Sequence, residues 1–329
     1  MSRLTLKKIA ATIGVACIAL TSLSAISQAD YPTRPVKLII PFAAGGSIDA
    51  LARLTSQQLA ARLGQPFIIE NRPGAGGTVG ADIVAKAASD GYTLLFTAQG
   101  PLVMNPFLMK RLPYDAEKSF STVTVVAEAP NVLATNPKSP FRSFPELLEH
   151  AKKQREKQMF ATQGIGTTGH VTGSLLSQRT GLELEHIAYQ GFPGMYTDVV
   201  TGRVGLMIAD TINVVPRVRS GELAPLAVAA HKRSSVLPNV PTFTELGYPE
   251  IVSGPWFAVL APAGTSMAVR RRLASTLREI LQSPEVQTKF RDLGVETRGT
   301  TPEEFEGLLR SEYKRWGDII RSSGITMKE

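Results

Sequence analysis

A unit of strand, glycine-rich turn and helix recurs along this 329-residue sequence and dominates its pattern. The apolar run VKLII leads into AAGGS (residues 43–47), and a helical pattern follows at once; QGIGTTGH (163–170) repeats the arrangement. Each helix is followed by a glycine turn and a second strand, which ends in another glycine loop at 71–78 or 190–194. The repeat predicts two lobes of the same design.

Ten short apolar segments alternate with amphipathic helical segments, which is typical of an α/β protein. Several are apolar nearly throughout, as expected for parallel strands covered on both faces. We predict strands at Val36–Phe42, Pro66–Glu70, Tyr92–Thr97, Val123–Glu128, Asn131–Asn136, Met159–Thr162, Leu182–Tyr189, Val204–Asp210, Leu223–Ala230 and Trp256–Leu260. After about Gly254 the chain has helical patterns but too few strands for a further lobe. It is therefore expected to return to the first lobe, which requires two crossovers and a hinge.

The N-terminus reads as a secretory signal peptide rather than as part of the fold. Arg3, Lys7 and Lys8 precede an apolar and small-residue stretch, and Ser27-Gln28-Ala29 offers a cleavage site before Asp30. The apolar stretch is too short and too rich in Ser, Thr and Ala for a spanning helix. We therefore expect cleavage after Ala29 and a mature periplasmic chain of residues 30–329.

The single cysteine, Cys17, lies in this leader. Acylation of Cys17 in a lipoprotein signal is an alternative, although Gly14 and the short preceding apolar stretch argue against it. The mature chain then has no disulfide and no thiol nucleophile. Its formal charge, +8 with the leader, becomes about +5. The scattered basic residues do not predict nucleic-acid binding, but they favour an anionic ligand.

The four glycine loops predict a binding cleft. Helix N-termini present backbone N–H groups and a partial positive charge, and glycine allows close approach to the backbone, so such sites suit carboxylate, phosphate or sulfate. Parallel strands place their ligands at the carboxyl ends. Two facing lobes would therefore bring four helix N-termini to one cleft. The alternative is that these glycines only form tight turns.

Enzymatic alternatives fit the loops less well. No glycine loop is followed by the lysine of a P-loop, and the dinucleotide fingerprint fails at Val79. Gly45-Gly46-Ser47-Ile48-Asp49 imitates the nucleophile elbow of a serine hydrolase, but Asp49 replaces its last glycine. Ser47 is more economically a helix N-cap. Asp49 either complements the helix dipole or faces the cleft, where it would attract an ammonium or accept from a hydroxyl. His150, His186 and His231 lack metal-ligand spacing with one another or with carboxylates, so no metal site is predicted.

Particular segments of the chain resemble the tripartite tricarboxylate transporter substrate-binding proteins, the Bug-type receptors, over the whole mature length. The ENRPGAGG segment, residues 70–77, is the most specific of them. The other matching segments include YPTRPVKLIIPFAAGG (31–46), LGQP (63–66), DGYTLL (90–95), LPYD (112–115), LPNVPT (237–242), APAGT (261–265) and TPEEF (301–305).

The resemblance implies a two-lobed periplasmic binding protein of the type II-like, Venus-flytrap kind, which captures a small carboxylate for membrane permease subunits. The expected lobes are residues 30–127 plus 254–329 and residues 128–253, in a monomer without cofactor. The candidate ligand-binding residues are Phe42, Ala44, Gly45, Gly46, Ser47, Asp49, Gly74, Ala75, Gly76, Gly77, Thr78, Gly164, Gly166, Thr167, Thr168, His170, Tyr189, Gly191 and Asp210. A serine hydrolase and a ligand sensor for a signalling partner remain the alternatives.

Departures from the family pattern lie mostly in the second lobe. Ser174 stands where Glu is usual, and Gly205 where Asp is common. The stretch Phe192–Tyr196 lacks the usual Pro-Ala order. Met195 and Tyr196 therefore suggest an aromatic or apolar ligand, whereas the carboxylate-binding loops of the first lobe look intact. His170 is either a ligand contact or a core residue.

Overall fold

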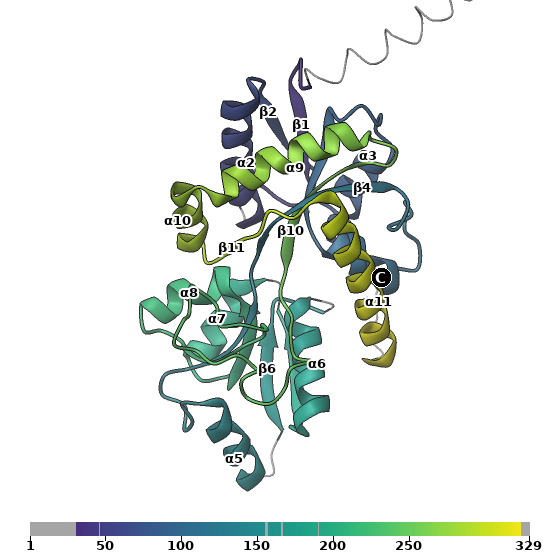
Figure 1. Cartoon of the computed structure of the whole chain (residues 1–329). Coiled ribbons are helices and arrows are strands. Elements are labelled where there is room, and N and C mark those ends of the chain that lie inside the picture. The colour runs from purple at the N-terminus through teal and green to yellow at the C-terminus, as the bar shows by residue number, and fades with distance from the viewer. Residues whose placement is uncertain (1–30, 46, 155–156, 166, 190, 324–329) are drawn as a thin grey trace, which may run out of the picture.

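Two β-sheets, one in each of two lobes, form the frame of the molecule (Figure 1). The computed structural model describes residues 31–323 apart from 46, 155–156, 166 and 190. The predicted signal peptide, its cleavage site and Cys17 lie outside these residues. None of the helices in the described part combines the length and the apolar character that a membrane span needs.

The first sheet has the strand order β11-β4-β10-β3-β1-β2. Strands β1 (Val36–Ile40), β2 (Phe67–Asn71) and β3 (Thr93–Ala98) are parallel neighbours. Strand β10 (Trp256–Pro262) lies antiparallel between β3 and β4 (Phe120–Glu128), and the short β11 (Glu296–Thr297) joins the edge. The other elements of this lobe are α2 (Ser47–Leu63), the 3₁₀ turn η2 (Ala75–Gly77), α3 (Thr78–Ala85), the π-helical turn η3 (Gly100–Met104), α4 (Asn105–Leu108), α9 (Met267–Gln282), α10 (Pro284–Asp292) and α11 (Pro302–Ser323).

The second sheet has the order β7-β6-β8-β5-β9. Strands β6 (Gln158–Thr162), β7 (Leu184–Ala188) and β8 (Leu206–Asp210) are parallel, whereas β5 (Asn131–Thr135) is antiparallel to β8 and to β9 (Ala224–Val228). The helices of this lobe, among the described residues, are α5 (Phe144–Gln154), α6 (Thr168–Thr180), α7 (Phe192–Val200) and α8 (Thr211–Arg219).

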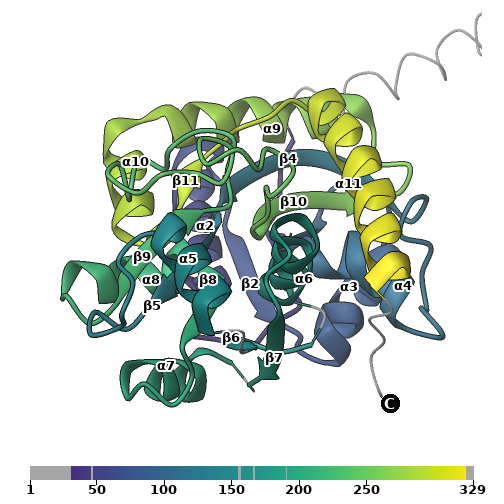
Figure 2. The ribbon, with the colours of Figure 1, turned by 90° about the horizontal axis from the view of Figure 1, so that it is seen from below.

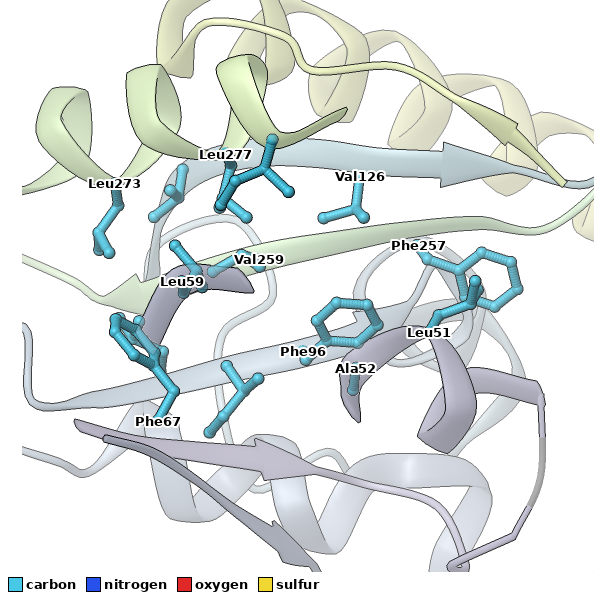
Figure 3. Close-up of a cluster of buried hydrophobic side chains, with 14 of the residues drawn as sticks. Leu51, Ala52, Leu59, Phe67, Phe96, Val126, Phe257, Val259, Leu273 and Leu277 are labelled. Carbon is cyan, nitrogen blue, oxygen red and sulfur yellow. The ribbon is translucent and has the colours of Figure 1, made fainter. Parts of the chain in front are cut away.

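Side chains from helices on both faces bury the first sheet. Leu51 and Leu59 of α2 and Leu277 of α9 pack with Phe96 and Val259 on one face (Figure 3). Side chains of α3 and α11 cover the other face, where Trp316 is fully buried. Seen from below, α9 and α11 accordingly run along different sides of the lobe (Figure 2). In the second lobe, α7 and α8 pack on one face and α5 and α6 on the other.

Two crossover segments connect the lobes and bond to each other. The amide of Ala129 donates to the Pro255 carbonyl (2.9 Å), and the amide of Asn131 donates to the Ser253 carbonyl (2.8 Å). The side chain of Asn131, which is buried, reaches Ser253 Oγ (3.2 Å) and Thr172 Oγ1 of α6 (3.0 Å). The crossovers thus form a hydrogen-bonded double linker, as expected for a hinge, and α6 is tied to both of its strands.

All ten predicted strands are present, with shifts at their ends, and the chain does return to the first sheet after the second crossover. The two-residue strand β11 was missed. Several strands are parallel, as expected, namely β1, β2 and β3 in the first sheet and β6, β7 and β8 in the second, whereas β4, β5, β9 and β10 pair antiparallel. The antiparallel strands β5 and β10 are buried along their whole length as well, so a mainly apolar run alone does not give the direction of pairing.

Candidate ligand-binding site

The carboxyl ends of the parallel strands in both sheets lie at the level of the crossovers. Ala98, the last residue of β3, pairs with Phe257 just after the second crossover. Asp210, the last residue of β8, pairs with Asn131 just after the first crossover. Because β1 and β2 run with β3, and β6 and β7 run with β8, all six strand ends are directed toward the junction of the lobes. The glycine loops of both lobes follow these ends.

In the first lobe, the loops after β1, β2 and β3 touch one another. A Cβ atom built on Gly77 would lie 2.7 Å from Pro101 Cγ and 3.2 Å from Phe42 Cζ. A side chain at residue 77 would therefore separate the three loops, and its φ of +91° also favours glycine. Sequence reasoning identified the first two loops but missed the third, which carries Gln99, Gly100 and Pro101.

The second loop has an unusual backbone. Four consecutive residues, Gly74 to Gly77, have positive φ, and Ala75 (φ 45°) is the only non-glycine residue with positive φ in the described chain. Within the turn the Gly77 amide donates to the Gly74 carbonyl (2.9 Å), and the Thr78 amide donates to the Ala75 carbonyl. Helix α3 begins directly after it without a side-chain cap at Gly77. Asn105 secures the loop, because its Nδ2 donates to the Gly76 carbonyl and to Thr78 Oγ1, both at 3.1 Å.

Asp49 holds the first loop in place. The residue is 3% exposed, and its carboxylate accepts hydrogen bonds from the Gly45 amide (3.0 Å), from Arg53 Nε (2.8 Å) and Nη2 (3.2 Å), and from Asn71 Nδ2 (3.0 Å). Hydrogen bonding to Arg53 is the main reason that the pKa of Asp49 is lowered to about 2; the bonds from Gly45 and Asn71 act in the same direction. Asn71 also donates to the Phe42 carbonyl (3.1 Å), so the loops after β1 and β2 are joined through this carboxylate.

The remaining first-loop candidates are placed less fully. Ala44 and Gly45 are exposed, and Ser47 begins α2, but the Ser47 side chain and Gly46 lie outside the described residues.

In the second lobe, the loop after β6 packs against the end of β7. A Cβ on Gly164 would lie 3.4 Å from the Tyr189 carbonyl, and the Gly191 amide donates to the Gln163 carbonyl (3.2 Å). Thr167 caps α6, since its side chain accepts from the His170 amide (3.4 Å). Helix α7 begins after Gly191 without a side-chain cap. Gly166 lies outside the described residues.

His170 packs within the second lobe. Its ring stacks on that of His186 with 3.8 Å between centroids, and His186 Nε2 lies 2.7 Å from Thr162 Oγ1. Burial lowers the pKa of both rings; for His186, where the charge of His170 adds to the effect, it falls to about 4. Both imidazoles are therefore neutral near pH 7, which agrees with a packing role for His170.

The residues around α7 contradict the expectation that Met195 contacts an apolar ligand. Met195 is completely buried in the core of the lobe, so it does not support an apolar ligand. Tyr196 stacks on Phe192 (5.6 Å between centroids) and lies under the guanidinium of Arg217 (4.7 Å). The hydroxyl of Tyr189 donates to Asp198 (2.6 Å), and burial is the main reason that the pKa of Tyr189 rises to about 12.

Asp210 is the last of the predicted ligand-binding residues. It is the N-cap of α8 and accepts from the amide (3.2 Å) and from Nδ2 (2.9 Å) of Asn213. Burial raises the pKa of this carboxyl, although the bonds from Asn213 oppose the effect. Thr168 Oγ1 in turn donates to Asn131 Oδ1 (3.3 Å), so the start of α6 and the first crossover share a polar network.

No group of three or more His, Cys, Asp or Glu residues in the described chain could hold a metal ion. A cavity of about 290 Å³ lies between α6, β6, β7 and α11, lined by Phe160, Ser174, His186 and Ile319 among others. It includes Ser174, where the sequence departs from the family pattern.

Two lobes of mixed α/β structure, a double crossover and glycine loops at the facing strand ends define a periplasmic binding protein. The family model described as the tripartite tricarboxylate transporter family receptor matches residues 51–325, and the chain belongs to this family. The predicted resemblance is thereby confirmed.

Individual relatives agree with this assignment. The chain is 38% identical to Protein BugT of Bordetella pertussis, over 98% of this chain and 99% of that protein. Among solved structures, it is similar to R. palustris Rpa4515 with adipate (TM-score 0.79, 34% identity, 90% of this chain and 100% of that chain). It is also similar to MatC from Rhodopseudomonas palustris with bound malate (TM-score 0.73, 31% identity, 88% and 100%).

Proposed function

We propose that this protein is an exported receptor that captures a small organic carboxylate between its two lobes and delivers it to the permease subunits of a tripartite tricarboxylate transporter. In this proposal, residues 1–29 are removed on export, and the mature monomer works in the periplasm. Its lobes are residues 30–127 plus 254–329 and residues 128–253. The ligand is bound and released unchanged.

The convergence of glycine loops at the junction of the lobes is the observation that carries the proposal. The loops after β1, β2 and β3 are packed together through Gly77, and α3 and α7 start without side-chain caps. Backbone N–H groups at such helix starts suit an anion, and the helix dipoles add to the attraction. Asp49 does not oppose this, because its charge is paired with Arg53.

The ligands of the similar structures support a carboxylate. One neighbour was solved with adipate and another with malate. Both ligands are dicarboxylates, so the second carboxylate would reach the opposite lobe, where the loops at 163–167 and 189–191 lie. The proposed contacts of the first carboxylate are the candidates between Phe42 and Thr78, and those of the second lie between Gly164 and Asp210.

Thermal unfolding of residues 30–329 against a panel of acids tests the proposal. The panel contains malate, adipate, citrate, nicotinate and aspartate, with phosphate and sulfate as controls. A ligand at 100 times its dissociation constant adds about 2.7 kcal/mol to the free energy of unfolding, which raises the midpoint measurably. We expect at least one carboxylate to do so, and the two inorganic anions not to.

A paired substitution locates the site. Gly76→Val places a branched side chain in the second loop, where even a Cβ lies 3.4 Å from Asn105 Nδ2, and it should abolish the shift caused by the acid. Gly205→Ala, whose Cβ meets nothing within 4 Å, serves as the control. No response to any acid, from protein freed of co-purified ligand by unfolding and refolding, would refute the proposed function.

A further inference from the structure

The lobes also contact each other outside the crossovers. Glu296, which begins β11 in the first lobe, accepts hydrogen bonds at Oε1 from Ser234 Oγ (2.7 Å) and from the Ser235 amide (2.9 Å). Both serines follow β9, and the next residues, 236–240, contribute Val and Leu side chains to the core of the second lobe. One carboxylate oxygen therefore joins the two lobes, and we call this interaction the Glu296 contact.

The backbone before Glu296 is held against the second lobe. A Cβ atom built on Gly294 would lie 2.7 Å from the Thr211 carbonyl oxygen and 3.0 Å from Ile212 Cα, at the start of α8. Thr211 in turn is attached to the first crossover, because its amide donates to the Pro130 carbonyl (3.0 Å). Figure 1 shows the turn between α10 and β11 above α8. The Glu296 contact thus belongs to a packed surface between the lobes.

The order of the strands places the Glu296 contact and the glycine loops on opposite sides of the crossovers. The crossovers continue β4 and β10 of the first sheet and lead into and out of the second lobe beside β5. In the first sheet, β3, β1 and β2 lie on one side of β10 and β4, and β11 lies on the other. In the second sheet, β8, β6 and β7 lie on one side of β5, and β9 lies on the other. The glycine loops follow the first group of strands in each sheet, whereas the Glu296 contact joins β11 to the segment after β9.

A further contact between the lobes has a different position. Val171 of α6 belongs to the same buried cluster as Trp256 of β10 and Trp316 of α11, and Arg315 Nη2 donates to the Val252 carbonyl. These residues lie over one face of the crossover strands and not beyond their edge. The Glu296 contact is therefore the one that lies across the crossovers from the glycine loops.

This arrangement acts as a lever. Capture of a ligand between the lobes requires the two sets of glycine loops to approach each other by rotation about the crossovers. Such a rotation moves β11 away from the segment after β9, on the opposite side. Hydrogen bonds to a carboxylate are stronger than those between neutral groups, so separating Glu296 from its two donors costs free energy.

We propose that the Glu296 contact opposes closure of the cleft and so sets the ligand affinity from outside the binding site; this rests on the proposed function. The apparent dissociation constant is the intrinsic one divided by the fraction of protein in the binding-competent arrangement. Weakening the contact increases the closed fraction and tightens binding, although no atom of Glu296 touches the ligand. Glu296 is thus a positioning residue for the lobes.

Three variants test this role. Glu296→Ala removes the acceptor of both hydrogen bonds, Ser234→Ala removes one donor from the opposite lobe, and Glu296→Gln keeps an uncharged acceptor. The matched control is Glu279→Ala, which removes an exposed carboxylate of α9 whose partner, Arg62, lies in the same lobe (3.4 Å). Titration calorimetry measures the dissociation constant of each, with whichever of malate, adipate, citrate, nicotinate or aspartate binds the parent most tightly. Small-angle X-ray scattering measures the radius of gyration without acid.

We expect Glu296→Ala to bind the acid about 3- to 10-fold more tightly than the parent, which corresponds to losing about one ordinary hydrogen bond from the open arrangement. Glu296→Gln should show a smaller gain, and Glu279→Ala none. Adding Ser234→Ala to Glu296→Ala should bring no further gain, because both remove the same interaction. The unliganded radius of gyration of Glu296→Ala should fall toward that of the parent with acid.

The unliganded unfolding midpoint shows whether each variant is folded, and Ser234→Ala decides if Glu296→Ala is not. A folded Glu296→Ala that binds the acid less than twofold more tightly than the parent, or more weakly, would overturn the proposed role and leave the receptor function standing. A parent that binds none of the acids would refute the receptor function itself, and the role of Glu296 would fall with it.

Discussion

Replacing Asp49 by Asn should loosen the first glycine loop and weaken both the fold and ligand binding. The carboxylate accepts four hydrogen bonds, from Gly45, from two nitrogens of Arg53 and from Asn71. An asparagine side chain keeps one acceptor oxygen, but its NH₂ group then faces donors in place of the second oxygen. The Phe42–Gly45 loop would lose its connection either to its own helix or to the end of β2.

The structure sets the size of the effect. Lowering the pKa of Asp49 from 3.8 to about 2 corresponds to at most about 2.4 kcal/mol. Solvent screening reduces this figure, because the Arg53 side chain is 56% exposed. The donor facing the new NH₂ group adds a penalty of about 1 kcal/mol. We therefore expect Asp49→Asn to lower the free energy of unfolding by about 2 kcal/mol, measured by urea denaturation at pH 7.

The pH dependence gives an independent check. The carboxylate of Asp49 has a lowered pKa in the folded state, so its stabilising effect is complete above about pH 4 and is lost as the pH falls toward 2. The difference in stability between the parent and Asp49→Asn should accordingly be constant from pH 5 to 8 and shrink below pH 4.

A matched control keeps the interpretation specific. Glu285→Gln removes an exposed carboxylate that pairs with Lys289 one helical turn away (2.7 Å), and it should leave the urea midpoint nearly unchanged. If Asp49→Asn unfolded at the same urea concentration as Glu285→Gln and bound the acid as tightly as the parent, the loop-holding role of Asp49 would be wrong.

Three further predictions follow from close contacts and from titration. Gly80→Ala should lower the free energy of unfolding in urea by about 1–3 kcal/mol, because its Cβ would lie 2.7 Å from Pro41 Cα. Gly307→Ala in α11 meets nothing within 4 Å and should be neutral or stabilising, so equal effects of the two substitutions would contradict this prediction. Asn131→Leu breaks the buried bonds to Thr172 and Ser253 and should cost about 2 kcal/mol in the same assay, and an unchanged transition would argue against the hinge network. The lowered pKa of His186 means that stability is complete above pH 6.5 and declines as the pH falls toward 4; the thermal midpoint of His186→Phe should fall less than that of the parent over this range, and parallel curves would exclude the histidine as the cause.

Local patterns in the sequence were sufficient to find the strands and the glycine loops. An apolar run that ends in Gly-Gly and continues as a helix is a short-range signal, so β1, β2, β6 and β7 and the helices after them could be predicted. The family was predicted in the same way, since ENRPGAGG lies within eight consecutive residues.

Pairings between distant residues could not be predicted from those patterns. The hydrogen bond from the Trp256 amide to Gln99 Oε1 joins residues that lie 157 positions apart in the sequence. The only sign of this contact in the nearby sequence is that the polar residue Gln99 stands before Gly-Pro at the end of a strand, and this pattern also fits an ordinary turn. The stacking of His170 on His186 and the hydrogen bond from Asn71 to Asp49 likewise depend on the folded loops.

The position of β10 fixes the order in which the molecule can be assembled. Strands β3 and β4 follow each other in the sequence but do not pair; β10, more than 120 residues later, lies between them. The first sheet therefore stays in two pieces until residues 256–262 have been made, while every strand of the second sheet comes from the uninterrupted stretch 131–228. Contacts between segments so far apart in the sequence form slowly, so the second lobe should fold first. The first sheet would then be completed by pairing strands that flank an already folded domain. A chain that stops before Trp256 would leave one complete domain attached to an open half-sheet with two unpaired edges, the kind of surface on which chains aggregate.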